Sequence, residues 1–324
     1  MFVPRRCVAP STTMKYSKPA RPYPDLARLL LDRGMTGNLR EIESYLQRVS
    51  YYRLSGYWYP FRCVEEDGGK KSRSDEFISG TRFSDMIERY EFDSELRSIV
   101  LKRIADFEVE FRTALAHEHS MQYGPFGYVD DPTCMPSMTA EAHASMLQTI
   151  QRERSRSNAE FVKHFKAKYS DDHWYMPVWT AAELMSFGTV FTWYRGSHQE
   201  IRRRVAESFL VHDNILLSWV RTIHSVRNIC AHHGRLWNRV LGVKPMIPRD
   251  SDWHTPVLVE NQRIFSVLTI LAYLSHSDAA LESWRSGLLD LLSRYQSIPK
   301  DRMGFPDDWH SSPIWMRNER DAVK

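Results

Sequence analysis

A run of 41 residues, Phe83 to Tyr123, contains neither glycine nor proline. Its apolar side chains recur every three or four residues, which places them along one side of an α-helix. We therefore expect one long helix in this part of the chain, or two helices joined by a kink.

Helical spacing of apolar residues is found through most of the remaining chain. A turn or short extended piece is expected at 51–62 and an exposed loop or hairpin at 64–82, because glycine, proline and charged residues interrupt the pattern there. No β-α-β order follows, so the sequence predicts an all-α fold, a helical bundle with a small irregular or hairpin insertion near residues 50–82. The further predicted helices are at 24–34, 39–49, 139–169, 177–195, 198–209, 213–232, 257–273 and 279–295.

The helical domain is expected to span residues 24–295. Residues 1–23 contain four prolines and are predicted to form an irregular arm, and residues 296–324 a C-terminal extension over the surface. The first thirteen residues lack the apolar core of a signal peptide, and Met14 is an alternative start. The longest apolar run, Phe265 to Leu274, is too short to span a bilayer, so we expect a cytoplasmic protein without membrane contact.

Charge and cysteine content narrow the classes of function. The four cysteines form no C-x-x-C pair, which argues against a disulfide scaffold and a zinc ribbon. The chain has 33 Arg against 11 Lys, and the planar guanidinium matches phosphate bidentately. Arginine excess is also common in proteins from GC-rich genomes, so nucleic-acid binding is one of two explanations. The 13 histidines are suited to proton transfer near neutral pH.

The densest polar cluster is RTIHSVRNICAHHGRLWNR, residues 221–239, which has four Arg and three His but no carboxylate. His224, Asn228 and His232 are four residues apart and therefore share one helix face. Gly234 is expected to end this helix, which leaves His232 near a C-terminus where the helix dipole favours an imidazolium.

An acid–base histidine beside an arginine suits metal-free RNA cleavage. The 2′-hydroxyl of the substrate attacks the adjacent phosphate, while a histidine moves protons and Arg227 neutralises charge on the phosphoryl oxygens. A metal site on His224, His232 and His233 is disfavoured, because adjacent histidines point in different directions and no carboxylate completes the ligand set. Composition alone produces about one Arg-x-x-x-x-His pair by chance, so a solvated helix face with a few hydrogen-bonded histidines is the alternative.

Four ordered blocks of the sequence are similar to one family. RNICAHHGRLWNR resembles the signature of the Abi-like (abortive-infection) family of the AbiD and AbiF type, whose members belong to the HEPN superfamily of α-helical ribonucleases. The segments at 51–62, 90–117 and 177–190 resemble the N-terminal motif, the long central helix and the third block of that family, in the same order.

The resemblance implies a HEPN-type helical bundle, an endoribonuclease and a role in phage defence as a toxin. It assigns catalysis to Arg227, Asn228 and His232, with His232 as general acid or base and Arg227 as phosphate clamp. It implies no metal or other cofactor, and products that end in a 2′,3′-cyclic phosphate. The residues expected to support the site or to bind RNA are His224, His233, Arg235, Arg239, Arg112, His117, Tyr52 and Arg53.

Two of these assignments have a structural alternative. Arg112 and His117 repeat the Arg-x-x-x-x-His spacing, but three nearby glutamates favour ion pairing, such as Glu108 with Arg112, over a second catalytic site. The aromatic block at 51–62 either stacks on unpaired bases or anchors the N-terminal helices to the bundle.

RNA is the expected partner, as substrate and as a structured antitoxin RNA. One motif supplies one histidine, whereas a full acid–base cycle uses two, so we expect two copies of the motif to face each other in a homodimer. The rival interpretation is a protein that binds RNA without cutting it, as a sensor or regulator in a defence or toxin–antitoxin system. Cleavage of single-stranded RNA in EDTA distinguishes the two.

The spacing of Arg227 and His232 corresponds to about 140° around an α-helix, so Arg227 has to reach around the helix to meet the histidine. Asn228 and His232 are expected in a partly accessible polar groove that also holds His224. The part of the long helix around Arg112 is expected to form the opposite wall.

Overall fold

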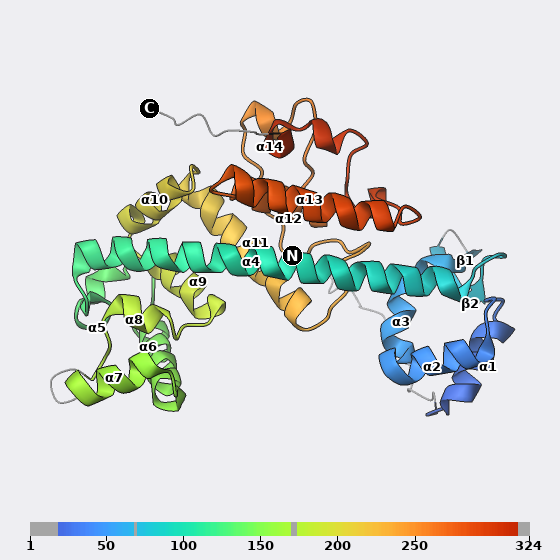
Figure 1. Ribbon diagram of the computed structural model, residues 1–324, viewed down its shortest axis with the longest axis horizontal. Coiled ribbons are helices and arrows are strands. Elements are labelled where there is room, and N and C mark those ends of the chain that lie inside the picture. Colours follow the sequence, from blue (N-terminus) through green and yellow to red (C-terminus); the bar gives the residue numbers. More distant parts are fainter. Residues whose placement is uncertain (1–18, 68–69, 170–173, 317–324) are drawn as a thin grey trace, which may run out of the picture. The chain divides into compact units, whose positions relative to one another are not determined.

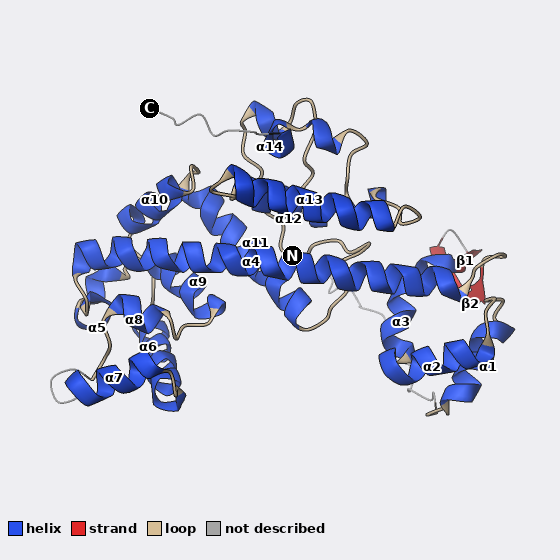
Figure 2. Cartoon of the chain, viewed as in Figure 1, coloured by secondary structure: helices blue, strands red, loops and turns tan. Residues whose placement is uncertain are grey.

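The computed structural model describes residues 19–67, 70–169 and 174–316. In these residues most of the chain is helical, and its one sheet is a two-stranded hairpin (Figure 2). The predicted all-α class is therefore confirmed. Most of the arm predicted for residues 1–23 lies outside the described residues. The chain divides after Tyr90 into two compact units, here called the N-terminal and the C-terminal unit, and each is described by itself.

The N-terminal unit consists of short helices, a hairpin and the first turns of a long helix (Figure 1). Asn38 and Ser50 begin two of the helices, because each side chain accepts a hydrogen bond from the backbone N–H three residues later. Gly34, with φ +92°, follows the end of the first helix, as expected from the sequence. The elements are α1 (Tyr23–Asp32), α2 (Leu39–Val49), α3 (Tyr51–Trp58), β1 (Arg62–Asp67), β2 (Lys70–Phe77) and the start of α4 (Phe83–Tyr123).

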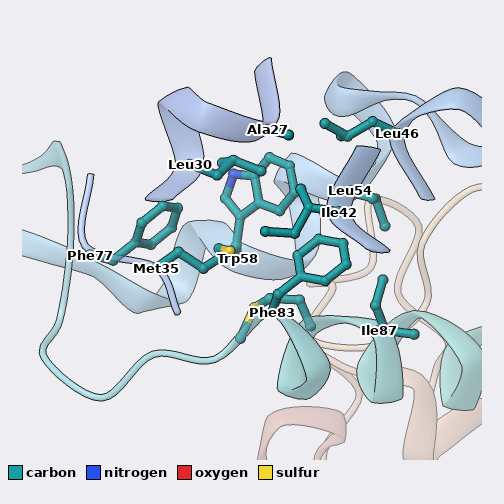
Figure 3. Packing of buried hydrophobic residues seen from close by; sticks show 11 residues of the cluster. Ala27, Leu30, Met35, Ile42, Leu46, Leu54, Trp58, Phe77, Phe83 and Ile87 are labelled. Atoms are coloured by element: carbon teal, nitrogen blue, oxygen red, sulfur yellow. The ribbon is translucent and has the colours of Figure 1, made fainter. Parts of the chain in front are cut away.

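The core of the N-terminal unit forms around the fully buried indole of Trp58 (Figure 3). Burial of this aliphatic and aromatic cluster removes its apolar surface from water, which is the main favourable term in folding. The side chains of this cluster around Trp58 come from α1, α2, α3, β2, α4 and the turn between α1 and α2: Ala27, Leu30, Met35, Ile42, Leu46, Leu54, Phe77, Phe83 and Ile87.

The turn or extended piece predicted at 51–62 is wrong, since its first eight residues form α3. Gly56 lowers the intrinsic helix propensity, but burial of Leu54, Tyr57 and Trp58 on one face outweighs that cost. Pro60 then occupies the first turn of a short 3₁₀ helix, where it needs no backbone donor. The hairpin predicted at 64–82 is confirmed: β1 and β2 pair antiparallel.

The C-terminal unit contains the rest of α4 and ten further helices in its described residues (Figure 1). The run without glycine or proline forms one uninterrupted helix of 41 residues. The most apolar helix, α12, is buried along almost its whole length. The helices after α4 are α5 (Gly127–Asp130), α6 (Ala140–Arg156), α7 (Glu160–Tyr169), α8 (Val178–Ala182), α9 (Phe187–Gly196), α10 (Gln199–Ser208), α11 (Asp213–Ala231), α12 (Ile264–Tyr273), α13 (Asp278–Arg294) and α14 (Pro313–Met316).

Two predicted helices are each divided in two. The helix expected at 139–169 is broken after Arg156, where the hydroxyl of Ser157 accepts a hydrogen bond from the Ala159 N–H. The helix expected at 177–195 is broken after Ala182, and Ser186 begins α9 by accepting a bond from the Thr189 N–H. In both cases serine competes with the helix for a backbone donor, which apolar spacing alone does not reveal.

The prediction that the last residues lie over the surface is wrong for their aromatic side chains. Trp309 and Trp315 are buried, with ring centroids 5.0 Å apart. The Trp315 indole N–H donates to Thr269 Oγ1 of α12 at 3.1 Å. This segment therefore completes the core around α12. Among the described residues, no helix is long and apolar enough to cross a membrane.

Candidate active site

One side of α11 is core and the opposite side is a solvent-facing stripe. The buried side includes Leu216, Trp219, Val220, Ile223, Val226 and Cys230. The opposite stripe advances by three or four residues at a time, so its members lie above one another, and each is exposed or half-buried. The stripe consists of Asn214, Leu217, Arg221, His224, Asn228 and, at the helix end, His232.

α11 ends in a Schellman turn that carries both adjacent histidines. His232 is the C-cap, and its N–H donates to the Asn228 carbonyl. His233 has a left-handed backbone with φ 56° and donates to the Cys230 carbonyl at 3.0 Å. The next N–H, of Gly234, donates to the Ile229 carbonyl at 2.7 Å. Both histidines are exposed, and their different backbone conformations send them in different directions.

The helix ends at this turn, as expected from Gly234, but the residue with the left-handed backbone is His233. Glycine is required at 234 for space instead. A Cβ there would lie 3.0 Å from Ile229 Cγ2 and 3.2 Å from the Ile229 carbonyl oxygen. Close approach of backbone to backbone therefore explains this glycine.

A buried carboxylate that we did not single out from the sequence holds the chain after the turn. Asp93 of α4 is fully buried and accepts hydrogen bonds from the N–H groups of Leu236, at 3.0 Å, and Trp237, at 2.6 Å. It also forms an ion pair with Arg97, one turn further along α4. The signal for this ion pair in the sequence was an acidic and a basic residue, Asp93 and Arg97, four positions apart between apolar neighbours. Asp93 positions the segment that follows His232 and His233.

His224 lies in an aromatic pocket against α9. Its ring is 5.7 Å from the ring of Phe187 and 6.0 Å from that of Phe191, and its Nε2 approaches Gly188 closely. Asn228 Nδ2 donates to His224 Nε2 at 3.2 Å. Burial, with a smaller contribution from the charge of Arg227, lowers the pKa of His224. The neutral imidazole therefore acts as an acceptor that orients the Asn228 amide.

The wall beside His224 is therefore α9, and not the part of α4 around Arg112 that we expected. The reason is the aromatic face of α9, which gives the imidazole a better packing surface than the charged side of α4 does. α9 packs along α11 as its neighbour in the fold (Figure 1).

Arg227 is half-buried beside the stripe, and among the described residues it has no ion pair. Its guanidinium is near enough to His224 to affect that side chain electrostatically. His232 is exposed at the end of the helix. Arg227, Asn228 and His224 thus lie together, with His232 at the open end of the same stripe.

Arg235 and Arg239 follow the turn and are both half-buried. Arg239 Nε donates to the Arg235 carbonyl at 2.7 Å, and this bond holds the Arg239 side chain against its own backbone segment. They extend the positive charge beyond the helix end. Residues 214–249 contain no Asp or Glu, so the charged side chains in this stretch of the sequence are all positive.

The second Arg-x-x-x-x-His pair has different surroundings. Arg112 donates to Glu108 Oε1 at 2.9 Å and to the Met185 carbonyl at 3.1 Å, and Glu183 lies 3.7 Å away. The expected Glu108–Arg112 ion pair is confirmed. His117 is exposed. Because its arginine is neutralised by two carboxylates, this pair is poorly suited to hold a phosphate.

Tyr52 and Arg53 lie in the N-terminal unit, on the outer face of α3. Tyr52 is 89% exposed, and Arg53 is also exposed. Of the aromatic block, Tyr57 and Trp58 are buried in the core of that unit. The block therefore anchors α3 through one face and presents Tyr52 and Arg53 to solvent on the other.

Possible metal ligands and the thiol of Cys230 complete the description of the site. Within the described residues, no group of three His, Cys, Asp or Glu side chains is arranged to hold a metal ion. Cys230 is buried on the core side of α11, and burial raises the pKa of its thiol to about 12. A neutral, buried thiol is a poor nucleophile.

The model of the Abi-like protein family matches residues 44–238, which include Arg227, Asn228 and His232. No curated protein and no solved structure matches the chain.

Proposed function

Because the chain belongs to the Abi-like protein family, we propose that it acts in abortive infection as a metal-independent endoribonuclease of the HEPN type. It cuts RNA at the C-terminal end of α11, as a toxin whose activity limits phage growth. Arg227 and His232 are the catalytic residues, and Asn228 positions the substrate phosphate or the histidine.

The observation that carries this proposal is the pairing of an exposed histidine with an arginine that has no carboxylate partner in the described residues. His232 is open to solvent at the end of α11, and Arg227 lies five residues earlier, in a stretch of the sequence, 214–249, that contains no Asp or Glu. The charge of an arginine in an ion pair is already neutralised by its carboxylate, as is the charge of Arg112. The guanidinium of Arg227 is therefore available to bind an anionic ligand, and phosphate matches its planar, two-donor geometry.

The chemical step needs no nucleophile from the protein. The RNA 2′-oxygen forms a bond to the adjacent phosphorus, and the bond from phosphorus to the 5′-oxygen of the next nucleotide breaks. One proton leaves the 2′-hydroxyl and one proton is delivered to the 5′-oxygen, so the products are a 2′,3′-cyclic phosphate and a 5′-hydroxyl. Arg227 stabilises the negative charge that develops on the phosphoryl oxygens.

His232 handles one of the two protons. His224 is unsuited to the other, because its Nε2 is bonded to Asn228 and its ring is packed between Phe187 and Phe191. A second His232 from another copy of the chain supplies the missing group in the proposed homodimer, in which two Arg227–His232 motifs face one RNA strand.

The test is cleavage of labelled single-stranded RNA in EDTA by purified protein. His232→Ala and Arg227→Ala are expected to lower the rate at least about a hundredfold, the usual range for loss of acid–base catalysis. His117→Ala is the matched control, because this exposed histidine belongs to the ion-paired motif with the same spacing, and it should retain full activity. RNA that is bound but not cut by the unaltered protein would favour the regulatory alternative. Cleavage that survives both substitutions would refute the site.

A further inference from the structure

A groove beside the candidate active site is lined by cations. It has a volume of about 700 Å³ and lies between α9, α11 and the loop at 242–246. Arg195, Arg221 and Lys244 line it, and all three are exposed. No carboxylate is among the lining residues. Within the described part of the chain, none of these three cations has an ion pair. We call this the α9–α11 groove.

The wall of the groove formed by the loop is fixed in place. Trp219 of α11 donates through its indole N–H to the Met246 carbonyl at 2.8 Å, and the Met246 N–H donates to Ser218 Oγ at 2.9 Å. On the other side of the loop, Asn261 Nδ2 donates to the Pro245 carbonyl at 3.1 Å. The cations are thus presented on a preorganised surface, which reduces the entropy lost when a ligand binds.

The groove lies along the same solvent-facing stripe of α11 as the candidate active site. Arg221 belongs to the same solvent-facing stripe of α11 as Asn228 and His232, and eleven residues of helix correspond to about 16 Å. Phe191 connects the two regions: its ring lines the groove, lies 6.0 Å from the ring of His224 and has the guanidinium of Arg195 over it at 5.9 Å. One polyanion can therefore lie along α11 and reach both places.

We infer that the α9–α11 groove binds the backbone of a single-stranded RNA segment next to the phosphate that is cut. Three cations without carboxylate partners suit successive phosphates. The half-buried ring of Phe191 suits an unpaired base, because the bases of a duplex are already stacked on each other. This inference rests on the proposed function, since it identifies the strand that reaches Arg227 and His232.

The experiment measures binding separately from cleavage. A labelled RNA of about ten unpaired nucleotides, a length within the usual range for single-strand sites, is titrated by fluorescence anisotropy into His232→Ala protein at several salt concentrations. The groove variant adds Arg195→Gln, Arg221→Gln and Lys244→Gln. The matched control adds Arg203→Gln, Arg204→Gln and Lys163→Gln, three exposed residues of the same unit whose loss changes the net charge equally.

The groove variant is expected to bind about a hundredfold more weakly at about 0.1 M salt, and the slope of log affinity against log salt should fall by about 2, because each phosphate contact on a single strand contributes about 0.7. The control should stay within about threefold of the parent. Equal effects of the two variants would overturn the inference, and so would tighter binding of a duplex than of the single strand.

Cleavage by the groove variant with His232 restored separates this inference from the proposed function. If the proposed function and the groove inference both hold, the groove variant has a higher KM and an unchanged kcat, because the groove binds the strand away from the reacting phosphate. If the unaltered protein cuts no RNA but the groove variant loses binding, the proposed function fails and the RNA groove stands. If the unaltered protein cuts RNA and the groove variant has an unchanged KM, the groove inference fails alone.

Discussion

Replacement of Asp93 by Asn is expected to lower the free energy of unfolding by about 3–5 kcal/mol, the usual cost of breaking a buried ion pair by removing one partner. Asp93 is fully buried and the Arg97 side chain is 6% exposed, so the substitution removes the carboxylate of a buried ion pair where little water can replace it. Leu236 and Trp237 both donate to Asp93 Oδ1, so an Asn can keep these two bonds only by turning its NH₂ group, a donor, toward the Arg97 guanidinium.

Urea unfolding followed by tryptophan fluorescence measures this loss as a shift in midpoint at constant slope. Glu160→Gln is the control, because Glu160 forms an exposed ion pair with Lys163 and its loss should cost less than about 1 kcal/mol. The double variant Asp93→Asn with Arg97→Met should regain part of the stability, since it also removes the buried charge that Asp93 had balanced. An Asp93→Asn loss as small as that of Glu160→Gln would refute the structural role of this carboxylate.

Two further predictions concern a buried histidine and a tight turn. Burial lowers the pKa of His119 from 6.5 to about 4, so the unfolded chain gains a proton as the pH falls through about 6.5, whereas the folded chain gains it only near pH 4. The free energy of unfolding should therefore fall by about 3 kcal/mol over that window. His119→Phe should abolish this loss, and an unchanged pH profile in this variant would contradict the prediction. Gly234→Ala should cost about 1–3 kcal/mol in urea unfolding, because the new Cβ meets Ile229, and a neutral effect would show that the turn relaxes freely.

The sequence was sufficient to locate α11 and its solvent-facing stripe. Apolar spacing separates the buried side from His224, Asn228 and His232, and a helix of known pitch then fixes which residues share a face. The same reasoning predicted α4, because its 41 residues include no glycine or proline, the residues that most disfavour a helix.

Other features depend on contacts that spacing along the chain does not encode. α3 forms although it contains Gly56, because Trp58 is buried by residues of α1, α2 and α4. α9 forms the wall beside His224 through Phe187 and Phe191, which lie more than 30 residues before it in the sequence. Asp93 accepts from backbone groups more than 140 residues away, as its bonds to Leu236 and Trp237 span 143 and 144 residues.

The chemical identity of the RNA ends made in EDTA tests the central claim most directly. If Arg227 and His232 perform metal-independent transesterification, the unaltered protein leaves a 2′,3′-cyclic phosphate and a 5′-hydroxyl, and it does not cut a strand whose scissile nucleotide lacks the 2′-hydroxyl. His232→Ala should yield neither end above background. Products with 5′-phosphates that form only when Mg²⁺ or Mn²⁺ is added would contradict the account, because they indicate attack by metal-activated water.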